Sequence, residues 1–317
     1  MPKYRNRLPQ LSDKLFLNDG GLETTLIYDD GLELPEFASF HLMRNSAGRD
    51  ALTRYYERHA AIAVAHGVGF LLESPTWRAS ADWGAKIGYS TDDLDAVNRQ
   101  AIEMMVDIRQ RMETDRTPMP ISGLMGPRAD AYSPEVLMGA AEAEAYHTRQ
   151  IASFAASEAD MVSAATLNHV GEAIGLTRAA VAADIPVSVS FTVETDGRLP
   201  TGQSLGDAIQ EVDAATDRAP AYFMINCAHP THFADTLARG GEWVKRLGGL
   251  QANASAKSHA ELDAATELDA GDPVAFGAEY AELIGRHTHI NVLGGCCGTD
   301  HRHIDHVGAA CIHAHAA

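Results

Sequence analysis

Three of the four cysteines in this chain stand directly after runs of apolar residues. Cys296 and Cys297 follow the run at 290–293 and are flanked by glycines, and Cys227 follows the run at 222–226. Neighbouring side chains on a strand point to opposite faces, so the strand must end here if both adjacent sulfurs are to reach one partner. Glycines let the backbone make that turn. Three converging thiolates predict a zinc ion with one coordination position left open.

A closed structural zinc site would need a fourth protein ligand, and nearby histidines leave that alternative open. His229 stands two residues after Cys227, and His301 and His303 follow the cysteine pair. A disulfide between the adjacent Cys296 and Cys297 would close a strained ring and leave Cys227 without a role.

An open zinc position with sulfur ligands favours a substrate thiol as its guest. A free thiol has a pKa of about 8.5 and is mostly protonated at neutral pH, whereas metal coordination holds it as the thiolate. Such a sulfur can attack a methyl group on a sulfonium or quaternary ammonium donor without help from an acid or base. The sequence agrees, because no Ser-His-Asp set or carboxylate pair is recognisable at the predicted strand ends.

The composition narrows the classes of partner. With 25 basic and 43 acidic residues the net charge is −18, which disfavours nucleic acid. No apolar run approaches the roughly 20 residues of a membrane helix, and no leader is recognisable after Met1. Four cysteines are too few for a disulfide framework, and their clustering fits a reducing compartment. We expect a soluble cytoplasmic protein whose partners are small molecules.

Strand-like and helix-like segments alternate along the chain, which predicts parallel strands with helical crossovers. Eight such units favour a closed (β/α)8 barrel of the TIM type, with the zinc site at the C-terminal strand ends. An open doubly wound sheet is the alternative, but no Gly-rich phosphate fingerprint supports it. No linker interrupts residues 1–317, so we expect one domain. The predicted strands are 14–18, 69–73, 120–123, 161–164, 186–191, 222–226, 249–253 and 289–293, and the predicted helices are 50–66, 91–113, 134–157, 170–183, 205–218, 230–247 and 273–286.

Three motifs together resemble those of the zinc-dependent homocysteine S-methyltransferase family. They are Asn226-Cys227, the Gly-Gly-Cys-Cys-Gly segment at 294–298 and the Asp-Gly-Gly turn that begins at Asp19. The resemblance covers nearly the whole chain. It implies a barrel in which Cys227, Cys296 and Cys297 hold zinc, with homocysteine as methyl acceptor and methionine as product. It also implies that Asp19 helps to hold the amino group of the amino acid.

Other residues of the expected site follow the predicted strands. Trp77 stands where the family has an aromatic loop, and its ring could face a methylated cation. Asn226 is expected to fix its loop, and Thr166 is expected near the substrate. The turn at 123–127 resembles the family's Gly-x-x-Gly-Pro turn, which shapes the pocket through close backbone approach.

The chain also departs from the family pattern. Ala165 stands where a carboxylate is expected to bind the substrate amine, Met224 replaces a glycine, and 251–254 replaces a Pro-Asn turn. These changes indicate a divergent member, so a different thiol acceptor or a non-catalytic zinc- or thiol-binding barrel remain alternatives. The compact chain resembles members that use S-methylmethionine or S-adenosylmethionine as donor.

Two peripheral segments carry further expectations. The segment 27–49 is long and holds Pro35 and aromatic residues, so it could form a lid over the barrel mouth. The tail 311–317 carries His313 and His315, and we expect a flexible end there in preference to a second metal site.

Overall fold

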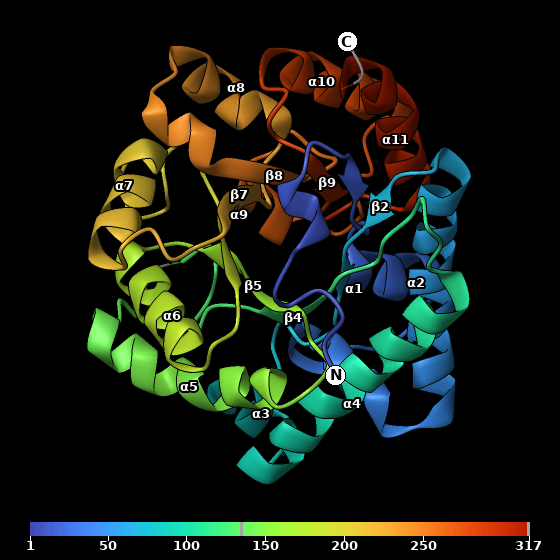
Figure 1. Ribbon diagram of the computed structural model, residues 1–317, viewed down its shortest axis with the longest axis vertical. Helices are drawn as coiled ribbons and strands as arrows, with labels where there is room; N and C mark the ends of the chain where they lie inside the picture. Colours follow the sequence, from blue (N-terminus) through green and yellow to red (C-terminus); the bar gives the residue numbers. More distant parts are fainter. Residues whose placement is uncertain (134–135, 316–317) are drawn as a thin grey trace.

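Parallel strands form a ring at the centre of the computed structural model, which describes residues 1–133 and 136–315 (Figure 1). Neighbouring strands are hydrogen-bonded in the order β2-β1-β9-β8-β7-β6-β5-β4-β3, and every pair is parallel. The strands are β1 (Phe16–Leu17), β2 (Gly69–Phe70), β3 (Leu72–Glu73), β4 (Ile121–Met125), β5 (Met161–Leu167), β6 (Val187–Phe191), β7 (Tyr222–Asn226), β8 (Leu247–Ala252) and β9 (Val292–Gly295).

The first and last strands in this order are two parts of one extended segment. The Leu71 nitrogen donates to the Leu17 oxygen at 2.9 Å, and the Leu72 nitrogen donates to the Pro120 oxygen at 2.9 Å. The segment therefore bonds to β1 on one side and to the β4 side on the other, and it closes the ring. The eight predicted strand segments are all present, and the predicted barrel is confirmed.

Helices surround this ring (Figure 1). C-terminal helix α11 packs beside α2, which brings the two ends of the helical layer together. The α-helices are α1 (Leu22–Thr24), α2 (Ser46–His66), α3 (Ala81–Lys86), α4 (Thr91–Met112), α5 (Ala140–Ala155), α6 (Val170–Ala182), α7 (Leu205–Ala215), α8 (Pro230–Arg239), α9 (His259–Asp263), α10 (Pro273–Arg286) and α11 (His301–His315). Shorter helical turns are η1 (Pro9–Leu11), η2 (Thr25–Asp29), η3 (Pro35–Phe37), η4 (Ser39–Arg44) and η5 (Glu242–Arg246).

Two predicted helix boundaries lie furthest from those in the structure. Helix α8 ends at Arg239, before the predicted 247, because Gly240 and Gly241 follow with φ angles of 73° and 134°. Helix α5 begins at Ala140, whereas Pro134 and Glu135, where it was expected to start, lie outside the described residues.

The expected flexible tail is wrong for residues 311–315, which belong to α11. Cys311 is fully buried there, because its position on the helix faces the apolar layer between helices and strands. Residues 316–317 lie outside the described part of the chain. In the described part, no helix combines the length and apolar character needed to cross a membrane.

A small apolar cluster fills the inside of the barrel. Apart from Leu8 of the N-terminal segment, its members come from β1, β5, β7, β9 and the residue between β2 and β3, so they can meet only in the interior. Met224, which replaces the family's expected glycine, belongs to this cluster, and Gly249 on the neighbouring strand makes room for it. A Cβ atom at Gly249 would lie 2.5 Å from the Met224 methyl carbon. The cluster contains Leu8, Phe16, Leu71, Met161, Tyr222, Met224 and Val292.

A buried ion pair fastens the end of the barrel opposite the predicted site. Asp160, just before β5, accepts from Arg109 Nη1 of α4 at 2.9 Å and from the backbone nitrogens of Ile121 and Tyr4 at 2.9 and 2.6 Å. Asp160 is fully buried. The pair joins the helical layer, two strands and the N-terminal segment.

We predict that Asp160→Ala lowers the free energy of unfolding by about 3 to 5 kcal/mol, because Arg109 and two backbone donors lose their buried partner. Urea denaturation followed by circular dichroism measures the change. The matched control is Glu158→Ala: Glu158 lies 4.0 Å from Arg109 with a 46% exposed side chain, and its loss should cost less than about 1 kcal/mol. Equal losses for the two variants would contradict the assignment.

Candidate functional site

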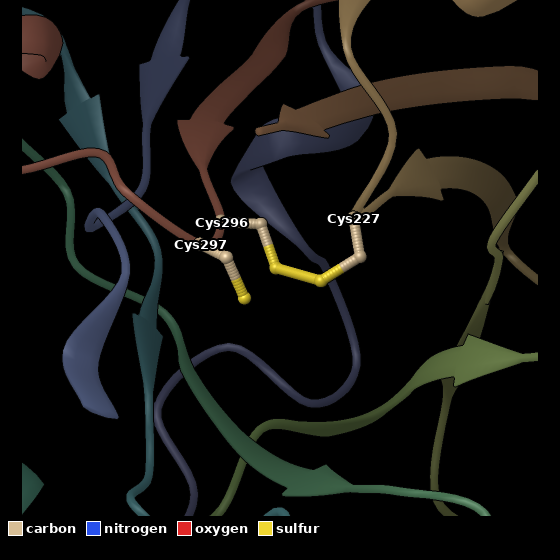
Figure 2. Close-up of side chains that lie close together, drawn as sticks. All are labelled: Cys227, Cys296 and Cys297. Carbon is tan, nitrogen blue, oxygen red and sulfur yellow. A yellow bond between two sulfur atoms is a disulfide. The ribbon is translucent and has the colours of Figure 1, made fainter. Parts of the chain in front are cut away.

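The three cysteines meet at the C-terminal ends of β7 and β9. Figure 2 shows their side chains directed toward one point, and their sulfurs lie within 4.8 Å of one another. The strand between them sets this distance, because both turns bond to β8. The Cys227 nitrogen donates to the Gln251 oxygen at 3.0 Å, and the Cys296 nitrogen donates to the Ala252 oxygen at 2.8 Å.

Glycines allow the turn that aims Cys296 and Cys297 at this point. A Cβ atom at Gly295 would lie 2.1 Å from the Thr299 hydroxyl oxygen, and one at Gly21 would lie 2.5 Å from the Cys296 carbonyl oxygen. A side chain at Gly21 would therefore push the Asp-Gly-Gly turn and the cysteine turn apart, and one at Gly295 would disrupt the cysteine turn itself. The two motifs are far apart in the sequence and form one packed unit.

Cys227 and Cys296 are joined as a disulfide, and the Cys297 thiol lies free beside them (Figure 2). This pairing was not predicted from the sequence, where only a bridge between the adjacent cysteines was considered. A sulfur held in a disulfide is not a thiolate, and thiolates are the sulfur ligands of metals. The disulfide of Cys227 and Cys296 therefore excludes a metal held by all three cysteines, and metal binding would need the reduced state.

The cluster has the composition of a metal site. In the part of the chain that the structure describes, it is the only group of three or more His, Cys, Asp or Glu side chains close enough together to hold one ion. His229, His301 and His303 do not join it. His303, for example, contacts the Asp300 carboxylate and donates from Nε2 to the Ala270 oxygen at 2.8 Å.

The surroundings of Cys297 keep its sulfur protonated when no cation is near. Burial, reinforced by the negative charge of Glu23, raises the pKa of Cys297 to about 11, although a hydrogen bond from Tyr132 opposes the shift. A bound cation would reverse this preference, because it favours the thiolate. The site thus favours deprotonated sulfur only together with a positive partner.

A cavity of about 450 Å³ opens beside the cysteines. All four predicted substrate-binding positions, Asp19, Trp77, Thr166 and Asn226, line it, as does Ala165. Tyr28 and Phe37, from the predicted lid segment 27–49, also line it. That segment therefore supplies part of the wall, and its opening and closing stay a prediction.

Asn226 and Thr166 are engaged with each other. Asn226 Oδ1 accepts from the Thr166 nitrogen at 2.8 Å and from the Ser190 hydroxyl at 2.7 Å, and Asn226 Nδ2 donates to the Thr166 hydroxyl at 2.7 Å. Thr166 has a φ angle of 62°, in the left-handed region. Asn226 thereby holds the ends of β5, β6 and β7 together, directly before Cys227.

Trp77 forms a fixed wall of the cavity. Its indole nitrogen donates to the Ala165 oxygen at 3.3 Å, and the Gly126 nitrogen donates to the Trp77 oxygen at 2.8 Å. A Cβ atom at Gly126 would lie 2.6 Å from the indole nitrogen. The predicted close approach at the 123–127 turn is therefore present, and it positions this ring.

Acidic side chains form another wall, and the sequence interpretation identified only one of them. Asp19, Glu23 and Glu73 all line the cavity. Burial, together with the charge of Glu73, raises the pKa of Asp19 well above its usual value. Burial likewise raises the pKa of Glu23, although the Ser39 hydroxyl donates to it at 2.7 Å. Glu73 could have been noticed as the charged residue that ends an apolar strand.

Three more cavity residues were not identified from the sequence. The His259 ring lies 4.3 Å from the Tyr132 ring, and its Nε2 donates to the Cys227 oxygen at 2.6 Å. The Arg78 guanidinium lies 3.8 Å from the centre of the Trp83 ring. Tyr132 stands in a loop without a distinctive pattern, whereas Arg78 follows Trp77 in a loop that was interpreted only for its aromatic ring.

Comparisons with known proteins agree with this fold. A family model described as "Homocysteine S-methyltransferase" matches residues 16–311. The homocysteine methyltransferase MmuM of Escherichia coli has a similar structure. Its metallated form is 15% identical with a TM-score of 0.72 over 96% of this chain and 99% of that one, and its oxidised form is 16% identical with a TM-score of 0.73 over 97% and 99%. No curated protein sequence matches the chain.

We predict that Asn226→Ala lowers the free energy of unfolding by about 1 to 3 kcal/mol, because the buried Thr166 nitrogen loses its acceptor. Thermal or urea unfolding measures this loss. Ser190→Ala removes a single hydroxyl from the same network and serves as the control with the smaller effect. If Asn226→Ala is no more harmful than Ser190→Ala, then Asn226 does not brace these strand ends.

Proposed function

The chain belongs to the homocysteine S-methyltransferase family, and from this premise we propose that it is a zinc-dependent enzyme that methylates homocysteine to methionine. The donor in this proposal carries its methyl group on a sulfonium or a quaternary ammonium. The observation that carries the proposal is the gathering of three cysteine sulfurs on the wall of a cavity that also holds a buried acid, Asp19.

The three cysteine ligands fit zinc. Cys227, Cys296 and Cys297 would hold it, and the cluster supplies three sulfur ligands without a histidine. When bound, zinc would keep a substrate thiol as its thiolate at neutral pH. The E. coli relative was solved in a metallated and in an oxidised form, which supports a site that exists either with metal or oxidised.

The chain's own residues bind and orient the substrates. Asp19 faces the cavity as a partner for the ammonium group of the amino acid, and that cation would offset the burial that disfavours its charge. Trp77, fixed by its hydrogen bond to the Ala165 oxygen, offers its ring to the methylated cation. Asn226 and Thr166 hold the loop before Cys227.

The reaction needs no proton transfer to the methyl donor, because its sulfonium or ammonium centre becomes a neutral sulfide or amine once the methyl group has left. The buried acids are therefore assigned to binding. Trp77, Tyr132 and Phe37 line the cavity, and they would keep water away from the reacting sulfur.

One observation favours a second candidate, in which the acceptor is a thiol other than homocysteine. Ala165 lines the cavity where the family pattern expects a carboxylate. A panel of thiols offered with the same donor separates the two candidates. In either case we propose that residues 1–317 act as one domain and that the active enzyme works in a reducing compartment such as the cytoplasm, since the three cysteines must be reduced.

We predict that the reduced, zinc-loaded protein forms methionine from L-homocysteine with at least one of S-methylmethionine, S-adenosylmethionine and glycine betaine. Mass spectrometry measures the product. Cys297→Ser should lower both zinc affinity and turnover by more than about 100-fold, because even residues that only support metal ligands commonly contribute 10- to 100-fold.

Cys311→Ala provides the matched control, since Cys311 is buried in α11 and does not line the cavity. This variant should keep both zinc and turnover. A Cys297→Ser protein that has lost zinc and still turns over at the original rate would refute the zinc mechanism.

A further inference from the structure

Glu73 has an unusual environment at the end of β3. It is 3% exposed and lines the cavity. Its Oε2 accepts from Asn18 Nδ2 at 2.9 Å and from Gln251 Nε2 at 2.8 Å. Its Oε1 is buried and has no hydrogen-bond partner among the described residues. A buried carboxylate oxygen without a hydrogen-bond donor costs folding free energy, so this oxygen is a candidate acceptor for a bound ligand.

The two amide donors fix the direction of the carboxylate. Asn18 lies at the end of β1 and Gln251 on β8, so Glu73 is held from two other strands of the barrel. Both donors use the same oxygen, which leaves the other available for a bound molecule. Gln251 belongs to the stretch that departs from the family's Pro-Asn turn. Two departures, Ala165 and Gln251, thus face the same cavity, and Gln251 binds the carboxylate directly.

No cation of the described protein is paired with this acidic wall. Among the described residues, neither Lys, Arg nor His forms an ion pair with Asp19, Glu23 or Glu73. Arg78 also lines the cavity, and its positive charge favours the ionised form of Glu23 from a distance. It forms no ion pair there, because it stacks on Trp83 and donates to the Glu36 oxygen. Uncompensated buried carboxylates favour a ligand that brings a positive charge.

We propose that Glu73 is a specificity-determining residue that receives the primary ammonium group of the thiol substrate together with Asp19. Glu73 would thus replace the carboxylate that the family pattern expects at position 165, where this chain has Ala165. The substrate class is then a thiol that carries an ammonium group, as homocysteine does. This inference rests on the proposed function, because it places an amino acid in the same cavity as the cysteines.

Two thiols that differ only in the amino group give the sharpest test. L-homocysteine carries the ammonium, and 4-sulfanylbutanoate has the same chain, thiol and carboxylate without it. Isothermal titration calorimetry on the reduced, zinc-loaded protein measures both affinities, and kcat/KM with the active donor gives a second readout. Glu73→Gln should weaken the binding of L-homocysteine roughly 10- to 100-fold, because a charge-assisted hydrogen bond is lost. Binding of 4-sulfanylbutanoate should stay within about twofold.

Two further variants separate recognition from packing. Adding Ala165→Glu to Glu73→Gln returns a carboxylate to the family's expected position, and it should recover most of the preference for L-homocysteine. Glu103→Gln, on the exposed surface of α4, makes the same chemical change away from the cavity and should change neither affinity.

The outcomes are distinguishable. If Glu73→Gln weakens the binding of both thiols equally, or of neither, the inference is overturned. Glu73 would then have only a structural role, as the hydrogen-bond acceptor of Asn18 and Gln251. Failure of the wild-type protein to prefer L-homocysteine would overturn it as well. If no donor supports methyl transfer, the proposed reaction fails, but the calorimetric preference still decides the role of Glu73.

Discussion

Cys227 and the Cys296–Cys297 pair stand on strands that are separated by β8, so their sulfurs can meet only where all three strands end at one level. The parallel barrel supplies that level, because every strand runs in the same direction and ends at the same rim. Hydrogen bonds from Cys227 and Cys296 to β8 then fix the spacing of the two turns. Most of the local structure serves this convergence, including Gly21 and Gly295, where any side chain would clash.

The cavity beside the cysteines has two chemically different walls. Its sulfur wall favours a soft metal cation, and its acidic wall, formed by Asp19, Glu23 and Glu73, favours an ammonium. Both walls are negative when ionised, and both are largely buried. In the proposed enzyme, the substrate and the metal would complete the charge balance of this site. A thiol with an ammonium group a few bonds away matches both walls.

The barrel was predictable because each strand is a buried apolar run and each crossover is a recognisable helix. The three cysteines were predictable because their residue type and their place after strands carry chemical meaning. The role of Glu73 was not predictable, because a single acidic residue at the end of an apolar run ordinarily marks only the end of a strand. The hydrogen bonds that it accepts from Asn18 and Gln251 become visible only in the tertiary structure. The bridge between Cys227 and Cys296 and the helical state of the tail likewise depend on tertiary contacts that spacing does not encode.

In the proposed enzyme, three thiolates hold a zinc ion with one position open to the sulfur of the substrate. Zinc K-edge X-ray absorption of the reduced protein tests it directly, before and after addition of L-homocysteine. We expect three sulfur neighbours and one lighter neighbour in the resting protein, changing to four sulfur neighbours with the thiol. A coordination shell that keeps a nitrogen ligand after the thiol is added, or that never contains three sulfurs, would contradict the account.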